Sequence, residues 1–515
     1  MLDRRGISRR GFLAGATALA LGASAAQPDR PGRVPIPAMP NRDAALLNLS
    51  AVEAVRLMTA GELAAEHYAQ VLLERCAEQR ALNAFITLEP DRVREAARAA
   101  DRRRASGAAL GPLHGLPIPV KDSLNTRDYP TTAGTPALRN FRPGRDAPIV
   151  EALVGAGAIV LGKTNLHELS YGWTSNNLAF GAVHNPYDPT RIPGGSSGGT
   201  AAAVAAHMAP LGVAEDTEGS IRVPAALCGL AGFRPTTGRY STQGAVPISP
   251  LFDQVGPHAR TVADLALFDA VGSGERGAPA PLPLKGVKLA VARGYFYGGL
   301  DAEVERLTEA ALERLRGAGA IVVEAEMPDL ESLIDLITDQ VQNHDVRVEL
   351  PKYLAAYGAP VSFADVVAQA SADIRSTFAR YVLPGGADFV SEGTYRAAVD
   401  VYLPRLRWLY RDYFARTGAA AMVFPATMVT APRIGEETEV SIRGQRVAFD
   451  VAVARNIAPG SSAGVPGLVL PAGLAANGLP VALEFDGPAG SDRALLALGL
   501  GVEAVLGPIA PPRLA

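Results

Sequence analysis

The sequence predicts an α/β fold in which a mixed, mostly parallel central sheet is flanked by helices. Short apolar runs alternate with segments of helical pattern, an order typical of strands joined by helices. The apolar runs near the end of the chain, such as 467–470 and 481–485, resemble those near its start. This likeness predicts a single sheet built from both halves. Of the 515 residues, 48% are hydrophobic and 20% are charged, as in a well-packed globular protein.

Residues 1–26 are predicted to be an export signal outside the fold. Arg9 and Arg10 form a twin-arginine pattern, and the mild apolar run that follows is too short and too rich in Ala and Gly to predict a membrane span. Residues 27–41 are rich in proline and predict an extended linker before a domain over 42–515. The mature protein is therefore expected to be periplasmic or secreted, with the twin-arginine (Tat) export machinery as a partner.

Helices are predicted to open this domain. Ser50-x-x-Glu53 and Thr59-x-x-Glu62 both match the capping box, so a helix is expected to begin at each. The second helix is expected to run to about residue 80. A further helix is predicted over about 91–104, because its last turn is basic and suits the negative end of the helix dipole.

From residue 116 the pattern changes to short strands and loops. Residues 116–120 predict a strand that delivers Lys121, and 158–161 predict another that ends near Lys163, with a helix over 148–155 between them. The Ala-rich run 200–207 predicts a buried helix whose N-terminus points at the glycine-rich loop before it.

The second half repeats this alternation after a soft boundary rich in Gly, Pro and Ala. The predicted elements are a strand at 287–291, a helix at 301–316, a strand at 320–323, a helical insert over about 330–409, and strands at 420–424, 467–470 and 481–485.

Charge and composition argue against several classes of partner. The formal net charge is -3 and no basic stripe is interleaved with aromatic residues, so nucleic acid is not an expected partner. Cys76 and Cys228 are far apart and are expected to be small buried residues, and none of the seven histidines forms a metal-spaced pair. Neither a metal nor a cofactor is predicted.

Two glycine-rich segments contain the candidate catalytic serines. They are 194–199, which contains Ser196, and 216–222, which contains Ser220. Glycines let backbone N–H groups converge, and a serine beside such groups can act as a nucleophile next to an oxyanion hole. A buried lysine such as Lys121 can serve as its base. The segments therefore predict a hydrolytic centre.

Two other interpretations of the first segment fit less well. A phosphate cradle would need a Gly-Lys-Ser/Thr sequence, which does not follow. Ser197 formally satisfies the Gly-x-Ser-x-Gly elbow of α/β-hydrolases, but that elbow requires a strand directly before it, and residues 185–193 have the composition of a loop.

The ordered motifs around these serines resemble the amidase signature family. The resemblance covers roughly residues 42–505 and is weakest in the helical insert. The matching pieces are Gly115–Asp122, Lys163-Thr164-Asn165, Gly194–Gly199, Asp216-Thr217, Gly219–Arg222, Pro224-Ala225, Cys228-Gly229, Ala463–Pro466 and Leu470–Gly473.

The resemblance implies a single amidase-signature-type domain with a Ser–cis-Ser–Lys triad. By position, Ser220 is similar to the nucleophile, Ser196 to the bridging serine that follows a cis peptide bond from Gly195, and Lys121 to the base. A serine needs a base within reach, and a lysine serves only where its pKa is lowered. The backbone N–H groups implied as the oxyanion hole are those of Thr217, Glu218, Gly219 and Ser220.

The expected function is an exported amidase that hydrolyses a small carboxylic amide to an acid and an amine or ammonia through a Ser220 acyl-enzyme. The alternatives left open are an esterase or carbamate hydrolase of the same family, or a catalytically silent binding protein. The family also includes an amidotransferase subunit acting on charged transfer RNA, but the export signal and the lack of a basic patch disfavour that role. A monomer or homodimer is expected.

Glu218 is the one residue inside the motif that departs from the family pattern, which usually has glycine there. Glu218 and Glu215 each have three possible roles: pairing with Arg222, stabilising a protonated lysine, or favouring cationic substrates. Gly195, Ser197, Asp216 and Arg222 are expected to support the site, as is Asp122. The substrate pocket is expected to be walled by the insert and by loops 129–139 and 425–433.

Overall fold

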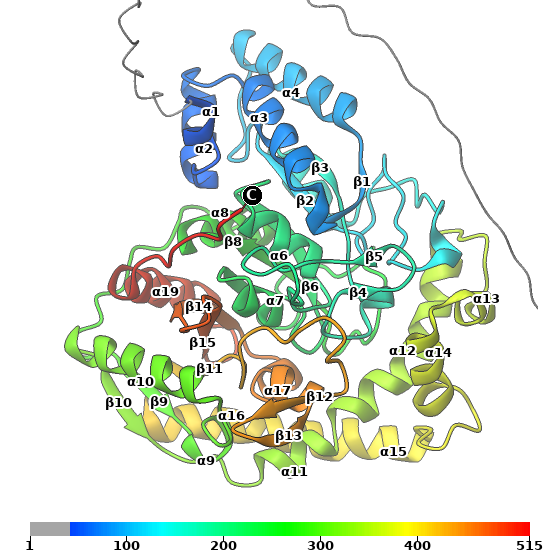
Figure 1. Ribbon diagram of the computed structural model, residues 1–515, viewed down its shortest axis with the longest axis vertical. Helices are drawn as coiled ribbons and strands as arrows, with labels where there is room; N and C mark the ends of the chain where they lie inside the picture. The colour runs from blue at the N-terminus through cyan, green and yellow to red at the C-terminus, as the bar shows by residue number, and fades with distance from the viewer. Residues whose placement is uncertain (1–41, 515) are drawn as a thin grey trace, which may run out of the picture. The chain divides into compact units, whose positions relative to one another are not determined.

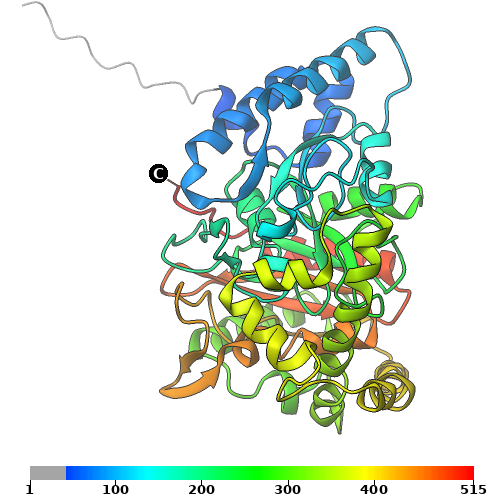
Figure 2. The same ribbon diagram turned by 90° about the vertical axis from the view of Figure 1, so that its right-hand side faces the viewer.

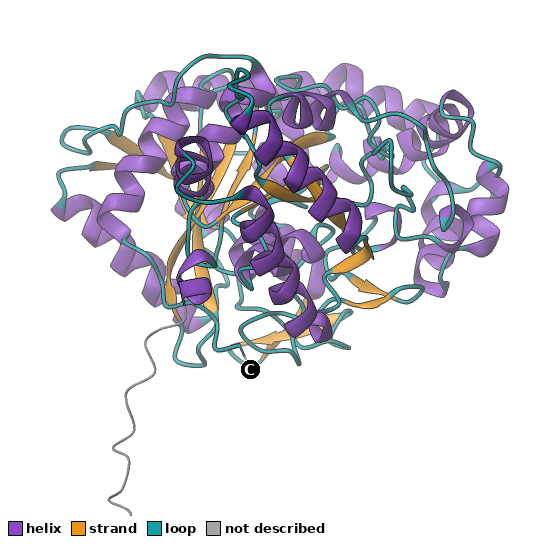
Figure 3. Cartoon of the chain, turned by 90° about the horizontal axis from the view of Figure 1, so that it is seen from above, coloured by secondary structure: helices purple, strands orange, loops and turns teal. Residues whose placement is uncertain are grey.

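An eleven-stranded mixed sheet runs through the part of the chain that the computed structural model describes, residues 42–514. These residues belong to one compact unit, Arg42–Ala515, and Figure 3 shows their strands in the centre with helices around them. The predicted signal and linker lie outside the described residues. The strands of the main sheet are β1 Phe85–Leu88, β2 Pro117–Lys121, β3 Ile159–Thr164, β6 Leu211–Asp216, β7 Ala231–Arg234, β8 Gln254–Ala259, β9 Lys288–Val291, β10 Ile321–Glu324, β11 Ala421–Pro425, β14 Gly467–Leu474 and β15 Pro480–Asp486.

The sheet order is β1-β3-β2-β6-β8-β7-β14-β15-β11-β9-β10, so strands from both halves of the chain share it, as predicted. Within residues 42–514, parallel pairing joins β3-β2-β6 at one end and β11-β9-β10 at the other. The six remaining pairs are antiparallel, which makes the centre less parallel than the alternating pattern suggested. Short connections such as the one between β14 and β15 allow antiparallel neighbours without a crossover helix. Two small sheets, β4 Asn176–Asn177 with β5 Gly181–Ala182 and β12 Glu439–Ile442 with β13 Gln445–Ala448, are separate.

Helices flank the sheet along its length. In Figure 1 the helices α3 and α4 lie beside β1 to β3, and α10 lies beside β9 and β10 at the other end. Their bounds are α1 Arg42–Leu46, α2 Ala51–Ala60, α3 Ala65–Glu78, α4 Pro90–Ala105, α5 Pro148–Gly155, α6 Gly198–Ala205, α7 Arg222–Leu227, α8 Val262–Ser273, α9 Arg293–Phe296, α10 Ala302–Gly317, α11 Leu330–Asp335, α12 Thr338–Ala356, α13 Phe363–Gln369, α14 Ala372–Thr377, α15 Glu392–Ala397, α16 Leu403–Thr417, α17 Phe449–Ala454, α18 Ala458–Ala463 and α19 Asp492–Leu506.

One of the two predicted capping boxes forms. The Ser50 hydroxyl accepts from the Glu53 backbone N–H at 3.2 Å, and the Glu53 carboxylate accepts from the Ser50 N–H at 2.9 Å. The prediction at Thr59 is wrong, because Thr59 lies in the last turn of α2 and α3 begins at Ala65. The carboxylate of Asp101, on α4, instead accepts from the Ala65 N–H at 2.9 Å.

The order of β2, β3 and β6 determines where the candidate catalytic residues lie. Strand β2 pairs in parallel with both β3 and β6, so the ends that carry Lys121 and Asp216 lie at the same edge of the sheet. Strand β6 was not predicted, since its sequence, Leu-Gly-Val-Ala-Glu-Asp, is short and ends in two carboxylates. Yet all six of its residues are buried.

Residues 330–417 are helical, with α11 to α16 and two π-helical turns at Phe378–Val382 and Ala398–Tyr402. Figure 2 turns the yellow-green helices of this segment toward the viewer. The largest apolar cluster lies elsewhere, between the sheet and helices such as α3, α8 and α19. Cys76 and Cys228 are free and buried, as expected. Among the described residues no helix is long and apolar enough to cross a membrane.

Candidate active site

Lys121 and Ser196 meet in the interior of the protein. Lys121 is the last residue of β2, and its Nζ lies 2.7 Å from Ser196 Oγ, with both residues fully buried. Another segment of the chain anchors the Ser196 loop, because the Ser196 carbonyl accepts hydrogen bonds from the His167 N–H at 3.0 Å and from Ser175 Oγ at 3.1 Å. Two residues 75 positions apart in the sequence are thus brought into direct contact.

The Gly195–Ser196 peptide bond is cis, as the resemblance implies. No side chain fits at Gly195, since an added Cβ would stand 2.7 Å from the Trp173 carbonyl carbon and 2.8 Å from the Thr174 nitrogen. The next residue, Ser197, donates its hydroxyl to the Glu215 carbonyl at 3.0 Å. Ser197 therefore ties the loop to the end of β6, which fits the supporting role expected for it.

Glu215 is the direct partner of the candidate base. Its Oε2 lies 2.6 Å from Lys121 Nζ and also accepts from Ser170 Oγ at 3.0 Å and from Ser123 Oγ at 3.3 Å. Of the roles left open by the sequence, Glu215 takes the contact with lysine rather than with Arg222. Burial lowers the pKa of Lys121, and the Glu215 carboxylate opposes this without cancelling it. The amine of Lys121 is consequently easier to deprotonate than that of a solvated lysine.

Ser220 stands in the loop between β6 and α7 and is 5% exposed. It lines a pocket of about 290 Å³ together with Thr217 and Glu218. Within residues 42–514 its hydroxyl has no hydrogen-bond partner, and the backbone N–H groups of residues 217–220 have no acceptor. Gly219 has φ +156°, and a Cβ there would stand 3.0 Å from Ile457 Cγ2. The loop thus presents a free hydroxyl and unused N–H groups beside a cavity.

Asp216 and Arg222 anchor this loop through buried ion pairs. Arg222 Nε lies 3.1 Å from Asp216 Oδ2, and Arg222 Nη1 lies 2.5 Å from Glu484 Oε1 on β15. Arg222 also donates to Ser461, and Arg234 adds a second cation 3.3 Å from Asp216. Burial alone would raise the pKa of Asp216, but the two guanidinium groups outweigh it and lower that pKa. The network ties the Ser220 loop to β15, in the far half of the sheet.

A second buried ion pair lies next to the first. Asp122 Oδ1 is 2.8 Å from Lys163 Nζ, with both side chains fully buried, and Asp122 Oδ2 accepts from Thr132. Burial raises the pKa of Asp122 and lowers that of Lys163, despite their mutual attraction. Asp122 therefore braces β2 and β3, and among the described residues no hydrogen bond or ion pair joins its side chain to that of the preceding residue, Lys121.

Glu218 faces the pocket and does not pair with Arg222. Its Oε2 accepts from Gln342 Nε2 at 2.8 Å, and burial, followed by the charge of Asp339, raises its pKa to about 8. The pocket is also lined by Asp450. The sequence singled out Glu218 but gave no signal for Asp339, Gln342 or Asp450, which lie more than 100 residues away.

The walls of the pocket come only partly from the expected segments. The helical insert contributes Asp339, Gln342, Asn343, Thr377 and Tyr381. The expectation for loops 129–139 and 425–433 is wrong for this pocket, because neither supplies a lining residue. Their place is taken by residues 170–173, which precede β4, and by Ile248.

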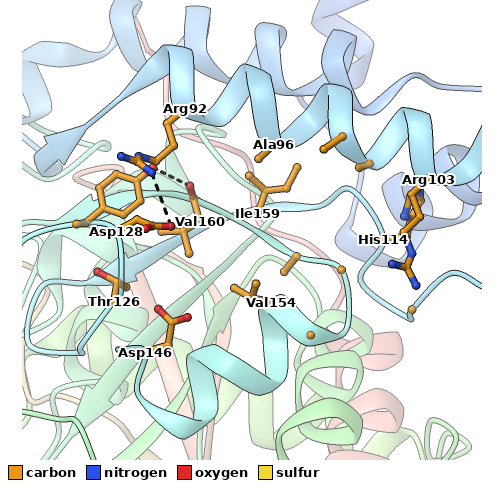
Figure 4. A pocket seen from close by; sticks show the side chains of 17 residues that line it. Arg92, Ala96, Arg103, His114, Thr126, Asp128, Asp146, Val154, Ile159 and Val160 are labelled. Atoms are coloured by element: carbon orange, nitrogen blue, oxygen red, sulfur yellow. Dashed lines mark hydrogen bonds and ion pairs between the residues drawn. The ribbon is translucent and has the colours of Figure 1, made fainter. Parts of the chain in front are cut away.

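Another cavity of about 490 Å³ is lined by residues of α4, α5 and β3, among them Arg92 and Arg103, and by loop residues such as His114 (Figure 4). It contains none of the predicted catalytic residues, and Figure 4 shows Arg92 already engaged with Asp128. Across residues 42–514, no group of three or more His, Cys, Asp or Glu side chains is placed to hold a metal ion.

Comparison with known proteins identifies the family. The family model described as Amidase matches residues 68–496. The chain is 40% identical over 436 residues to an indoleacetamide hydrolase of Agrobacterium vitis, covering 84% of this chain and 92% of that one. It is 35% identical over 477 residues to a mandelamide hydrolase of Pseudomonas putida, covering 90% and 92%. A crystal structure described as an amidase superposes with a TM-score of 0.79 at 33% identity, covering 89% of this chain and 100% of that one. The chain therefore belongs to the amidase signature family, whose members hydrolyse amide C–N bonds.

Proposed function

We propose that this protein hydrolyses a small carboxylic amide through an acyl-enzyme on Ser220, with Ser196 as the proton relay and Lys121 as the base. The observation that carries the proposal is the buried 2.7 Å contact between Lys121 Nζ and Ser196 Oγ, in a loop that adjoins a pocket lined by Ser220. The indoleacetamide and mandelamide hydrolases among the relatives support an amide as the substrate.

The first half of the reaction forms the acyl-enzyme. Ser220 Oγ attacks the amide carbonyl carbon while its proton moves to Ser196 and the Ser196 proton moves to the neutral amine of Lys121. A hydroxyl can relay in this way because it both donates and accepts a hydrogen bond. The oxygen of the tetrahedral intermediate is stabilised by the unused backbone N–H groups of residues 217–220.

The second half returns the protons. The ammonium of Lys121 gives its proton back through Ser196 to the departing nitrogen, the C–N bond breaks, and ammonia or an amine leaves. Water then attacks the Ser220 ester along the same route and releases the acid. Burial makes this lysine suitable, since it lowers the pKa of Lys121 and so makes the neutral amine easier to reach than in a solvated lysine.

The triad is tested with Ser220→Ala and Lys121→Ala. We expect Ser220→Ala to abolish both amide turnover and labelling by a fluorophosphonate, and Lys121→Ala to lower kcat/KM by about 10²–10⁴-fold. Ser197→Ala serves as the matched control, because Ser197 lies in the same loop and donates to a backbone carbonyl. Normal turnover by pure Ser220→Ala protein would refute the assignment.

The same test separates the other functions. A catalytically silent binding protein would not be labelled at Ser220 in the wild type. An esterase or carbamate hydrolase would be labelled but would turn over those substrates faster than amides of the same acyl group. A panel of aryl, aliphatic and peptide amides with matched esters and carbamates ranks these activities.

We also propose export by the twin-arginine route, to the periplasm or the medium. Its support is the Arg9-Arg10 pattern. Replacing both residues with lysine should leave the precursor inside the cell, and an unchanged distribution in fractionated cells would contradict it.

A further inference from the structure

Three carboxylates surround the pocket at the nucleophile without a counter-ion. Glu218 follows β6, Asp339 lies in the first turn of α12, and Asp450 lies in the first turn of α17, and all three line the pocket with Ser220. Among the described residues, no Lys, Arg or His forms an ion pair with any of them. Other acidic groups of this active site, Glu215 and Asp216, are paired with cations.

An adjoining cavity of about 200 Å³ extends this acidic region. It shares Glu218, Asp339 and Asp450 with the first and adds Glu331 and Asp335. Its one cation in the described residues, Arg455, donates to the Gly298 carbonyl and the Asn456 side chain rather than to these carboxylates. Among the described residues, Arg455 therefore makes no hydrogen bond or ion pair with any of these carboxylates.

Gln342 holds two of the carboxylates close together. Its Nε2 donates to Glu218 Oε2 at 2.8 Å and to Asp339 Oδ1 at 3.1 Å. Two carboxylates that share one amide group repel each other, and the burial of Glu218, followed by the charge of Asp339, raises the pKa of Glu218 to about 8. A neutral occupant leaves that repulsion in place, whereas a bound cation relieves it.

The aromatic lining of the pocket suits the same occupant. Tyr171, Trp173 and Tyr381 line it beside the carboxylates, and ring faces attract ammonium and guanidinium groups. Ser220 lines the same pocket, and its hydroxyl is nearly buried and has no hydrogen-bond partner among residues 42–514. The pocket thus offers a nucleophile for a carbonyl and a carboxylate–aromatic surface for a cation.

We propose that the substrate is an amide that carries an ammonium or guanidinium group, with its carbonyl at Ser220 and its cation held by Glu218, Asp339 and Asp450. This inference rests on the proposed function and narrows its substrate class. It assigns Glu218, the residue that departs from the family pattern, to substrate selection.

The test compares amides that differ only in charge. The pairs are ω-aminoalkanamides against methyl-terminated alkanamides of equal length, and phenylalaninamide against 2-methyl-3-phenylpropanamide. We expect kcat/KM to be at least about 10-fold higher for the best cationic member than for its partner, mostly through KM, and the ratio to fall as ionic strength rises.

Variants identify the residues responsible. Glu218→Gln and Asp339→Asn should each reduce the cation preference at least about 10-fold, and a cooperative thermal unfolding transition like that of the wild type shows that the variants fold. Glu313→Gln is the control for a change of net charge, because Glu313 is an exposed residue of α10 that pairs with Arg316. It should leave the preference unchanged.

The two proposals fail in different ways. Turnover of neutral arylacetamides equal to or better than that of every cationic amide, with no effect of Glu218→Gln, overturns the inference and leaves the amidase intact. Absence of turnover with all amides overturns the proposed function. In that case calorimetric titration with benzylammonium against benzyl alcohol decides the cation site, since binding does not require Ser220 to react. Equal affinities for the two compounds overturn it.

Discussion

Replacing Glu215 with glutamine should shift the acidic limb of the pH profile of kcat/KM to lower pH. The Glu215 carboxylate lies 2.6 Å from Lys121 Nζ, and the two side chains are at most 1% exposed. Its charge favours the ammonium form, which cannot accept the proton of Ser196. Removing that charge while keeping the shape of the side chain lowers the pKa of Lys121, so the active neutral amine persists at lower pH.

The distance sets the size of the effect. At an effective dielectric constant of about 20, two unit charges this close interact by about 6 kcal/mol. A third of that value, allowing for the hydroxyl groups that already solvate Glu215, corresponds to a pKa change of about 1.5. We therefore expect the limb to move down by at least about 1 pH unit, as measured from initial rates of amide hydrolysis across the pH range.

Asp122→Asn provides the matched control. It breaks the neighbouring buried ion pair with Lys163, in which Asp122 Oδ1 lies 2.8 Å from Lys163 Nζ, but the Asp122 side chain forms no hydrogen bond or ion pair with the Lys121 side chain. The Asp122→Asn variant should be less stable than the wild type, but the acidic limb of its kcat/KM profile should lie at the wild-type pH. If the acidic limb of the kcat/KM profile of Glu215→Gln stays in place or moves to higher pH, Lys121 is not the base whose charge Glu215 controls.

Two further predictions concern stability. Arg222→Met leaves Glu484 buried without its guanidinium partner and leaves Asp216 with that of Arg234 alone, and breaking a buried pair in this way costs about 3–5 kcal/mol. A urea unfolding midpoint equal to that of the wild type would show that the network does not stabilise the fold. Glu218 has a folded-state pKa of about 8, above its ordinary 4.5, so the folded state holds a proton that the unfolded chain releases between these values. The free energy of unfolding should therefore fall as pH rises from about 4.5 to 8. The melting temperature should drop more between pH 5 and pH 9 for the wild type than for Glu218→Gln.

Much of the fold could be predicted because its signals are local. The capping box at Ser50 and the strand that ends at Lys121 need only neighbouring residues, and both form. The box at Thr59 fails because a long-range contact, Asp101 with the Ala65 N–H, sets where the next helix begins. Strand β6 escaped prediction because its six buried residues include two carboxylates whose cations come from other elements.

The sequence by itself determined the family, the three candidate catalytic residues and the oddity of Glu218, since these depend on motifs read along the chain. Tertiary structure alone decided that Glu215 pairs with Lys121 and that Glu218 joins Asp339 and Asp450 at the pocket. These pairings depend on which strand ends and helix ends share an edge of the sheet. Charge acts through distance in space, and residues 94 or more positions apart are adjacent only after the chain has folded.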